Sequence, residues 1–152
     1  MNSELSGSTV FDTSVLLELA IDSPMSRQVR DNVLTGQVQA MTGELNITEL
    51  GYLLCRKSGK EQATKTVGYL RRANQVRILA SASFLDQAAE MKCGRSMSLV
   101  DCVTVAMGEL LGAPVLFAKH ERELDLEMKK TPFKTKLHFM EESWSPLGTS
   151  AP

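Results

Sequence analysis

Thr9-Val10-Phe11-Asp12-Thr13-Ser14-Val15-Leu16-Leu17 is the stretch that constrains the fold most strongly. A short apolar strand runs directly into an acid, and an apolar helical stripe begins three residues later. Further apolar strand candidates, each next to a helical pattern, occupy residues 38–41, 76–80, 115–118 and 136–140. Strands that alternate with helices pair in parallel, and helices then cover both faces of the sheet. We therefore expect an α/β fold, a three-layer α/β/α sandwich with a central parallel sheet.

The length of the chain corresponds to one domain. Its 152 residues are 43% hydrophobic and 23% charged, as in an ordinary globular protein. We assign residues 1–142 to the domain and residues 143–152, rich in Ser, Pro and Gly, to a flexible C-terminal tail. No apolar stretch is long enough to cross a bilayer, and residues 1–7 lack the features of a secretion signal. We expect a cytoplasmic protein without membrane attachment.

Three acids stand where predicted strands pass into helices. Asp12 directly follows the first strand, whereas Glu49 and Asp101 are each expected in the first turn of a helix. Asn46 and Ser98 precede these two acids by three positions, which is the spacing of a capping box. One interpretation is that each acid only stabilises a helix N-terminus, by about 0.3–1 kcal/mol.

Taken together, the three acids favour a metal site. The functional crevice of an open parallel sheet lies at the carboxyl ends of its strands, and carboxylates gathered there repel one another unless a cation binds. Mg²⁺ and Mn²⁺ prefer oxygen ligands, and such ions can polarise a phosphodiester and activate water. The sequence has no phosphate-binding glycine loop and no Gly-x-Ser-x-Gly motif. The three cysteines, Cys55, Cys93 and Cys102, do not form the closely spaced pairs that a zinc site requires. We expect them to be buried free thiols.

Four short segments resemble the PIN-domain family, especially its VapC-type toxins. VFDTSVL (10–16) resembles the opening strand with the first acid, and TGELNITEL (42–50) resembles the segment that carries the glutamate. SLVDCVTVA (98–106) resembles the third motif, and GAPVLF (112–117) resembles the following turn and strand. The segments follow one another in the family's order, so the resemblance covers the chain from about residue 9 to 121.

The resemblance implies both an activity and a set of site residues. PIN domains commonly act as Mg²⁺- or Mn²⁺-dependent endoribonucleases, often as dimeric toxins paired with an antitoxin protein. Asp12, Glu49 and Asp101 match the family's metal-binding acids. Ser14 matches a position whose hydroxyl supports the water shell of the metal.

The chain departs from the family at the fourth acid. A Thr-x-Asp segment often follows the strand, but Phe117-Ala118-Lys119 stands there in this chain. A lysine repels a second cation, which argues against a two-metal mechanism. Glu121, as a fourth catalytic acid, is the better substitute, and Glu123 is the other candidate.

The distribution of basic residues suggests how RNA would be held. The net charge is −1, yet residues 56–77 contain seven basic residues against one acid. We expect Arg56, Lys57, Arg71 and Arg72 to position an RNA backbone. The first hypothesis is therefore a metal-dependent endoribonuclease. The alternative is a weak or inactive PIN-fold module that binds RNA or a protein partner, an alternative that Lys119 favours.

Overall fold

The structure, a computed structural model, describes residues 5–143. Five strands form one sheet in the order β3-β2-β1-β4-β5, and every neighbouring pair is parallel. The strands are β1 (Gly7–Phe11), β2 (Val38–Gly43), β3 (Val76–Leu79), β4 (Val115–Phe117) and β5 (Leu137–Phe139). The predicted parallel sheet is confirmed. The tail predicted over 143–152 lies, from residue 144 on, outside the described residues.

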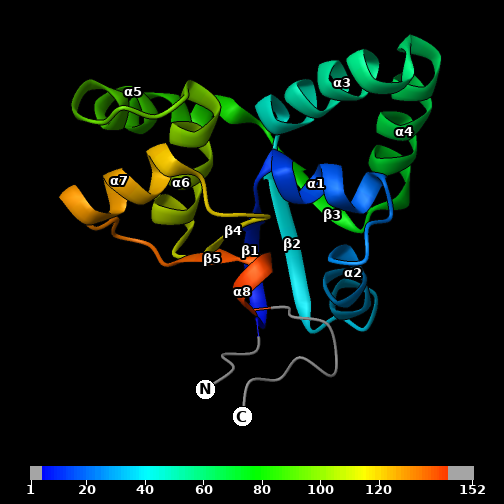
Figure 1. Cartoon of the computed structure of the whole chain (residues 1–152), viewed down its shortest axis with the longest axis horizontal. Helices are drawn as coiled ribbons and strands as arrows, with labels where there is room; N and C mark the ends of the chain where they lie inside the picture. Colours follow the sequence, from blue (N-terminus) through cyan, green and yellow to red (C-terminus); the bar gives the residue numbers. More distant parts are fainter. Residues whose placement is uncertain (1–4, 144–152) are drawn as a thin grey trace.

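Helices cover both faces of the sheet, as Figure 1 shows. One face carries α1 (Thr13–Ala20), α2 (Ser26–Leu34), α3 (Glu44–Ser58) and α4 (Lys60–Ala73). The other face carries α5 (Leu85–Gly94), α6 (Leu99–Leu111) and α7 (Arg122–Lys130). A short 3-10 turn, η1 (Ser81–Phe84), precedes α5, and α8 (Met140–Ser143) follows β5. The three-layer α/β/α prediction is confirmed.

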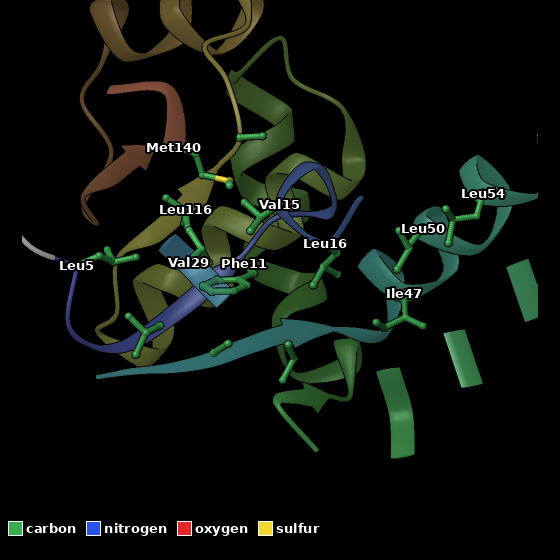
Figure 2. Packing of buried hydrophobic residues seen from close by; sticks show 14 of the residues in the cluster. Leu5, Phe11, Val15, Leu16, Val29, Ile47, Leu50, Leu54, Leu116 and Met140 are labelled. Carbon is green, nitrogen blue, oxygen red and sulfur yellow. The ribbon is translucent and has the colours of Figure 1, made fainter. Parts of the chain in front are cut away.

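The strand pleat divides the apolar core into two clusters. Phe11 and Leu116 point towards α1–α4, whereas Val10 and Val115 point towards α5–α7. Figure 2 shows the first cluster, in which Phe11 is fully buried among side chains from α1, α2 and α3. Because successive side chains of a strand alternate between faces, the two apolar residues at the end of β1, Val10 and Phe11, contribute to different cores.

Several boundaries differ from those predicted. The second strand continues to Gly43, the last is confined to Leu137–Phe139, and α5 begins only after η1. The prediction of buried thiols holds for Cys102 but is wrong for Cys55 and Cys93, which are exposed. Both belong to helices, where only one face is covered by the core. Within residues 5–143, none of the helices combines the length and apolarity that a membrane crossing requires.

The topology changes direction at β1. From β1 the chain passes through α1 and α2 to β2 on one side, and β4 with β5 lies on the other side. The helices α1 and α7, which follow the adjacent strands β1 and β4, cover opposite faces. In such sheets the crevice at the carboxyl ends of these two strands is the usual place for a ligand.

Candidate metal centre

Asp12 lies at the carboxyl end of β1 and caps α1. Its Oδ2 accepts hydrogen bonds from the backbone N–H of Ser14, at 2.9 Å, and from the Ser14 hydroxyl, at 2.7 Å. The hydroxyl oxygen of Ser14 in turn accepts a hydrogen bond from the backbone N–H of Ala118, at 3.0 Å. Ser14 therefore fixes the Asp12 carboxylate against the end of β4. This contact explains why a hydroxyl two residues after the acid is useful.

The second carboxylate oxygen of Asp12, Oδ1, differs from the first in its surroundings. The residue is only 4% exposed, and its Oδ1 is buried without a hydrogen-bond partner among residues 5–143. Burial raises the pKa of Asp12 to about 6, and the charge of Glu49 adds to this rise, although the hydrogen bonds from Ser14 oppose it. A buried carboxylate oxygen that lacks a donor is in an unfavourable environment, which a cation would relieve.

Asp101 stands in the first turn of α6, where the sequence predicted it. The Ser98 hydroxyl oxygen caps this helix and accepts a hydrogen bond from the backbone N–H of Asp101, at 3.1 Å. Burial raises the pKa of Asp101 to about 7, with further contributions from the charges of Asp12, Glu121 and Glu49. The four predicted acids therefore interact electrostatically, although they come from different junctions of the fold.

Glu49 occupies a different position in its helix from the one that the sequence predicted. Helix α3 begins at Glu44, so Glu49 lies in its second turn rather than its first. Gly43, not Asn46, precedes the helix, because β2 continues further than predicted. The Glu49 side chain is half-buried, and its Oε2 accepts a hydrogen bond from the Tyr52 hydroxyl at 3.3 Å.

Asn46 has a structural role that the sequence did not reveal. It is fully buried, and its Oδ1 accepts a hydrogen bond from the backbone N–H of Gly43 at 3.2 Å. Its Nδ2 donates to the hydroxyls of Thr13, at 3.1 Å, and Thr104, at 2.9 Å. These three residues belong to α3, α1 and α6, so one side chain joins the helices at the three acidic junctions. An Asn within an apolar helical stripe was the signal that could have revealed this role.

Glu121 lies at the start of α7, on the loop that leaves β4. It is exposed, and its charge contributes to the raised pKa of Asp101, which favours it as the fourth acid. His120 holds this loop in place, because its two ring nitrogens lie 2.6 Å from carboxylate oxygens of Asp125 and Glu142. Burial lowers the pKa of His120, but these hydrogen bonds outweigh it and raise the pKa overall.

The oxygen atoms of the four acids and of Ser14 fit a hard divalent cation. The groups available there are carboxylate and hydroxyl oxygens, the ligands that Mg²⁺ and Mn²⁺ prefer. Among the described residues, no hydrogen-bond donor competes with a cation for Asp12 Oδ1. No three Asp, Glu, His or Cys side chains of residues 5–143 converge closely enough to hold one metal ion as they stand. Binding would therefore require side-chain rotation, above all of Glu49, which is turned towards Tyr52.

The structure does not bring the four predicted RNA-binding residues together. Arg56 and Lys57 lie in the last turn of α3, whereas Arg71 and Arg72 lie in the last turn of the antiparallel α4. At 1.5 Å per residue, the two pairs stand about 18 Å apart along the hairpin. Arg71 also forms a two-pronged ion pair with Glu44, with contacts of 2.8 and 2.9 Å.

Some solved structures with a similar fold are described as a toxin or a toxin–antitoxin complex. VapC20 of Mycobacterium tuberculosis, described as a toxin that cleaves the sarcin–ricin loop, is 21% identical, with a TM-score of 0.58. The match covers 70% of this chain and 86% of that one. A chain of DNA-bound VapBC from Salmonella typhimurium is 14% identical, with a TM-score of 0.63, and the match covers 88% of this chain and 98% of that one. At these identities, the likeness concerns the fold.

A chain of VapBC2 from Rickettsia felis, bound to a DNA fragment from its promoter, is also 14% identical. Its TM-score is 0.62, and the match covers 87% of this chain and 98% of that one. No protein of curated function matches the sequence. The PIN domain family, however, matches residues 9–125, which include all four acids. The chain therefore belongs to the PIN domain family.

Proposed function

We propose that this protein is an Mg²⁺- or Mn²⁺-dependent endoribonuclease. The observation that carries the proposal is the buried Asp12 Oδ1, which has no hydrogen-bond partner among the described residues and lies in a group of mutually repelling acids. Carboxylates that raise one another's pKa values destabilise the fold unless a cation or protons neutralise them. Family membership supports a nuclease over other uses of such a cation.

Each acid has a distinct part in this proposal. Asp12, Glu49 and Asp101 would hold the cation, and Ser14 would keep the Asp12 carboxylate oriented. Glu121 is exposed, and its carboxylate could accept a proton from the attacking water. When bound, the cation would polarise the phosphodiester and make that water easier to deprotonate.

The partners follow from the same proposal. The substrate would be RNA, and the toxin–antitoxin complexes among the similar folds support an antitoxin protein that restrains the activity. A homodimer in the cytoplasm remains our expectation for the active form. The RNA backbone would contact Arg56 and Lys57 at one end of the α3–α4 hairpin and Arg72 at the other.

One observation favours a second candidate function. Lys119 is exposed and occupies the place where the family often has its fourth acid. A PIN-fold module that binds RNA or protein without cutting would tolerate this lysine. It would bind divalent cations weakly, and its association with RNA would survive the removal of metal.

Calorimetric titration with Mn²⁺ separates the two functions. For the nuclease we expect binding to the wild type and none to the Asp12→Asn/Asp101→Asn variant, together with RNA cleavage that EDTA abolishes. Protons compete with the cation for carboxylates of pKa about 6 and about 7, so the affinity should fall as the pH is lowered from 8 to 6. Metal-independent RNA binding without cleavage would instead support the module.

A further inference from the structure

A groove runs along the hairpin formed by α3 and α4. Its volume is about 520 Å³, and Figure 1 shows α3 leading outward from the end of β2 and α4 returning along the edge of the molecule towards β3. Gly51 and Gly68, which line the groove from opposite helices, leave it open, while Ala63 and Val67 provide an apolar floor. Lys60 lies on its lining at the start of α4.

Tyr52 lines this groove and also contacts Glu49, one of the four acids of the candidate metal centre. Tyr52 is 45% exposed. Its hydroxyl donates to Glu49, whose charge contributes to the raised pKa values of Asp12 and Asp101. The groove therefore lies next to Glu49, and the Tyr52 side chain contacts both.

Arg56 lies above the Tyr52 ring, with its guanidinium carbon 5.0 Å from the ring centre. An exposed aromatic ring with an arginine beside it offers two flat surfaces on which a nucleobase can stack. The surroundings also suit a polyanion, because residues 44–73 contain six basic residues against three acids, whereas the whole chain carries a net charge of −1. Charge and stacking chemistry thus point to the same kind of ligand.

We infer that the α3–α4 groove is a binding subsite for single-stranded RNA, in which a nucleobase stacks on Tyr52 and Arg56 beside the acidic centre. Lys60 contacts the phosphates that follow this base along the groove. The inference rests on the proposed function, because it describes how the RNA substrate would reach the acids. Binding at this subsite nevertheless requires neither metal nor cleavage.

The test measures RNA binding without cleavage. A labelled single-stranded RNA of about eight nucleotides, with 2-aminopurine as one base, is titrated against the full chain in EDTA at low salt. Tyr52→Leu should weaken binding about tenfold and abolish quenching of the 2-aminopurine. Tyr52→Phe should keep both, because the ring rather than the hydroxyl stacks. The matched control is Tyr69→Leu on α4, which removes an exposed tyrosine that lines a different pocket with residues of α1 and α2 and should leave binding unchanged.

The outcomes separate this inference from the proposed function. Tyr52-dependent binding by a protein that never cleaves RNA would uphold the subsite and refute the nuclease. Metal-dependent cleavage unaffected by Tyr52→Leu, or equal losses in the Tyr52→Leu and Tyr69→Leu variants, would overturn the subsite alone. If Tyr52→Leu leaves RNA binding intact and changes only self-association, measured by sedimentation, the groove holds a protein and the inference fails.

Discussion

Replacement of Asp12 by Asn should stabilise the metal-free protein at alkaline pH, although it removes a proposed metal ligand. The fold raises the pKa of Asp12 from 3.8 to about 6. Each unit of this shift corresponds to 1.36 kcal/mol, so ionised Asp12 destabilises the native state by about 3 kcal/mol. The Asn amide needs an acceptor where Oδ1 now lies, and a buried amide without one costs about 1–3 kcal/mol. The net gain at pH 8 is then about 0–2 kcal/mol, and it is larger when a neighbouring carboxylate accepts the hydrogen bond of the amide.

The pH dependence gives this prediction its sign. For an acid whose folded pKa is raised, stability falls as the pH rises from its unfolded pKa, 3.8, through its folded pKa, about 6. Below this window Asp12 is protonated in both states, and the advantage of the variant disappears. Urea unfolding in EDTA at pH 4.5 and pH 8 should therefore show the largest difference between wild type and variant at pH 8.

Metal should reverse the order of the two proteins. Mn²⁺ at 100 times its dissociation constant stabilises a binding protein by about 2.7 kcal/mol, and the variant would not receive this stabilisation. Asp86→Asn is the matched control, because Asp86 also stands in the first turn of a helix, α5, but is exposed. An Asp12→Asn variant that loses the same stability at both pH values would refute the electrostatic reasoning.

Three further changes test the scaffold and the site. Asn46→Leu should lower the free energy of unfolding by about 1–3 kcal/mol in urea, because the buried N–H of Gly43 loses its acceptor. Gly108→Ala places a methyl group 2.4 Å from a Val115 side-chain carbon and should lower stability by about 1–3 kcal/mol, seen as a lower melting temperature. Lys119→Asp should tighten Mn²⁺ binding in calorimetry and speed RNA cleavage, and unchanged affinity would show that this position does not face the cation.

The sequence predicted the sheet because its strands are short, apolar and directly followed by helices. At β1 the three residues before Asp12 are buried, and the alternation of Val10 and Phe11 between the two cores follows from the pleat alone. The position of Asp12 at the carboxyl edge of the sheet could be anticipated in the same way, whereas Asp101 stands on α6, which follows α5 rather than a strand. Parallel strands place their carboxyl ends at one edge of the sheet, wherever the acids stand in the chain.

Other features depend on contacts between distant segments, which no local pattern reveals. Asn46 looked like a helix cap because the end of β2 was placed too early, and its partners Thr13 and Thr104 are 33 and 58 residues away. The basic residues formed one cluster in sequence, yet the turn at Gly59 sends Arg56 and Arg72 to opposite ends of the hairpin. Tyr52 carried no signal of its own, because its significance comes from Glu49 and Arg56 together.

The position of Asn46 follows from the repulsion between the acids. Asp12 and Asp101 have raised pKa values and belong to junctions of different helices, so their charges tend to push α1 and α6 apart. Apolar packing between helices is not directional. The hydrogen bonds from the buried Asn46 amide to Thr13 and Thr104 are directional and hold α1 and α6 together against this repulsion. The amide is neutral, so it holds the helices without neutralising the acids, which stay available for a cation. An Arg or Lys at this position would add a positive charge beside the acids and would leave the buried N–H of Gly43 without its acceptor.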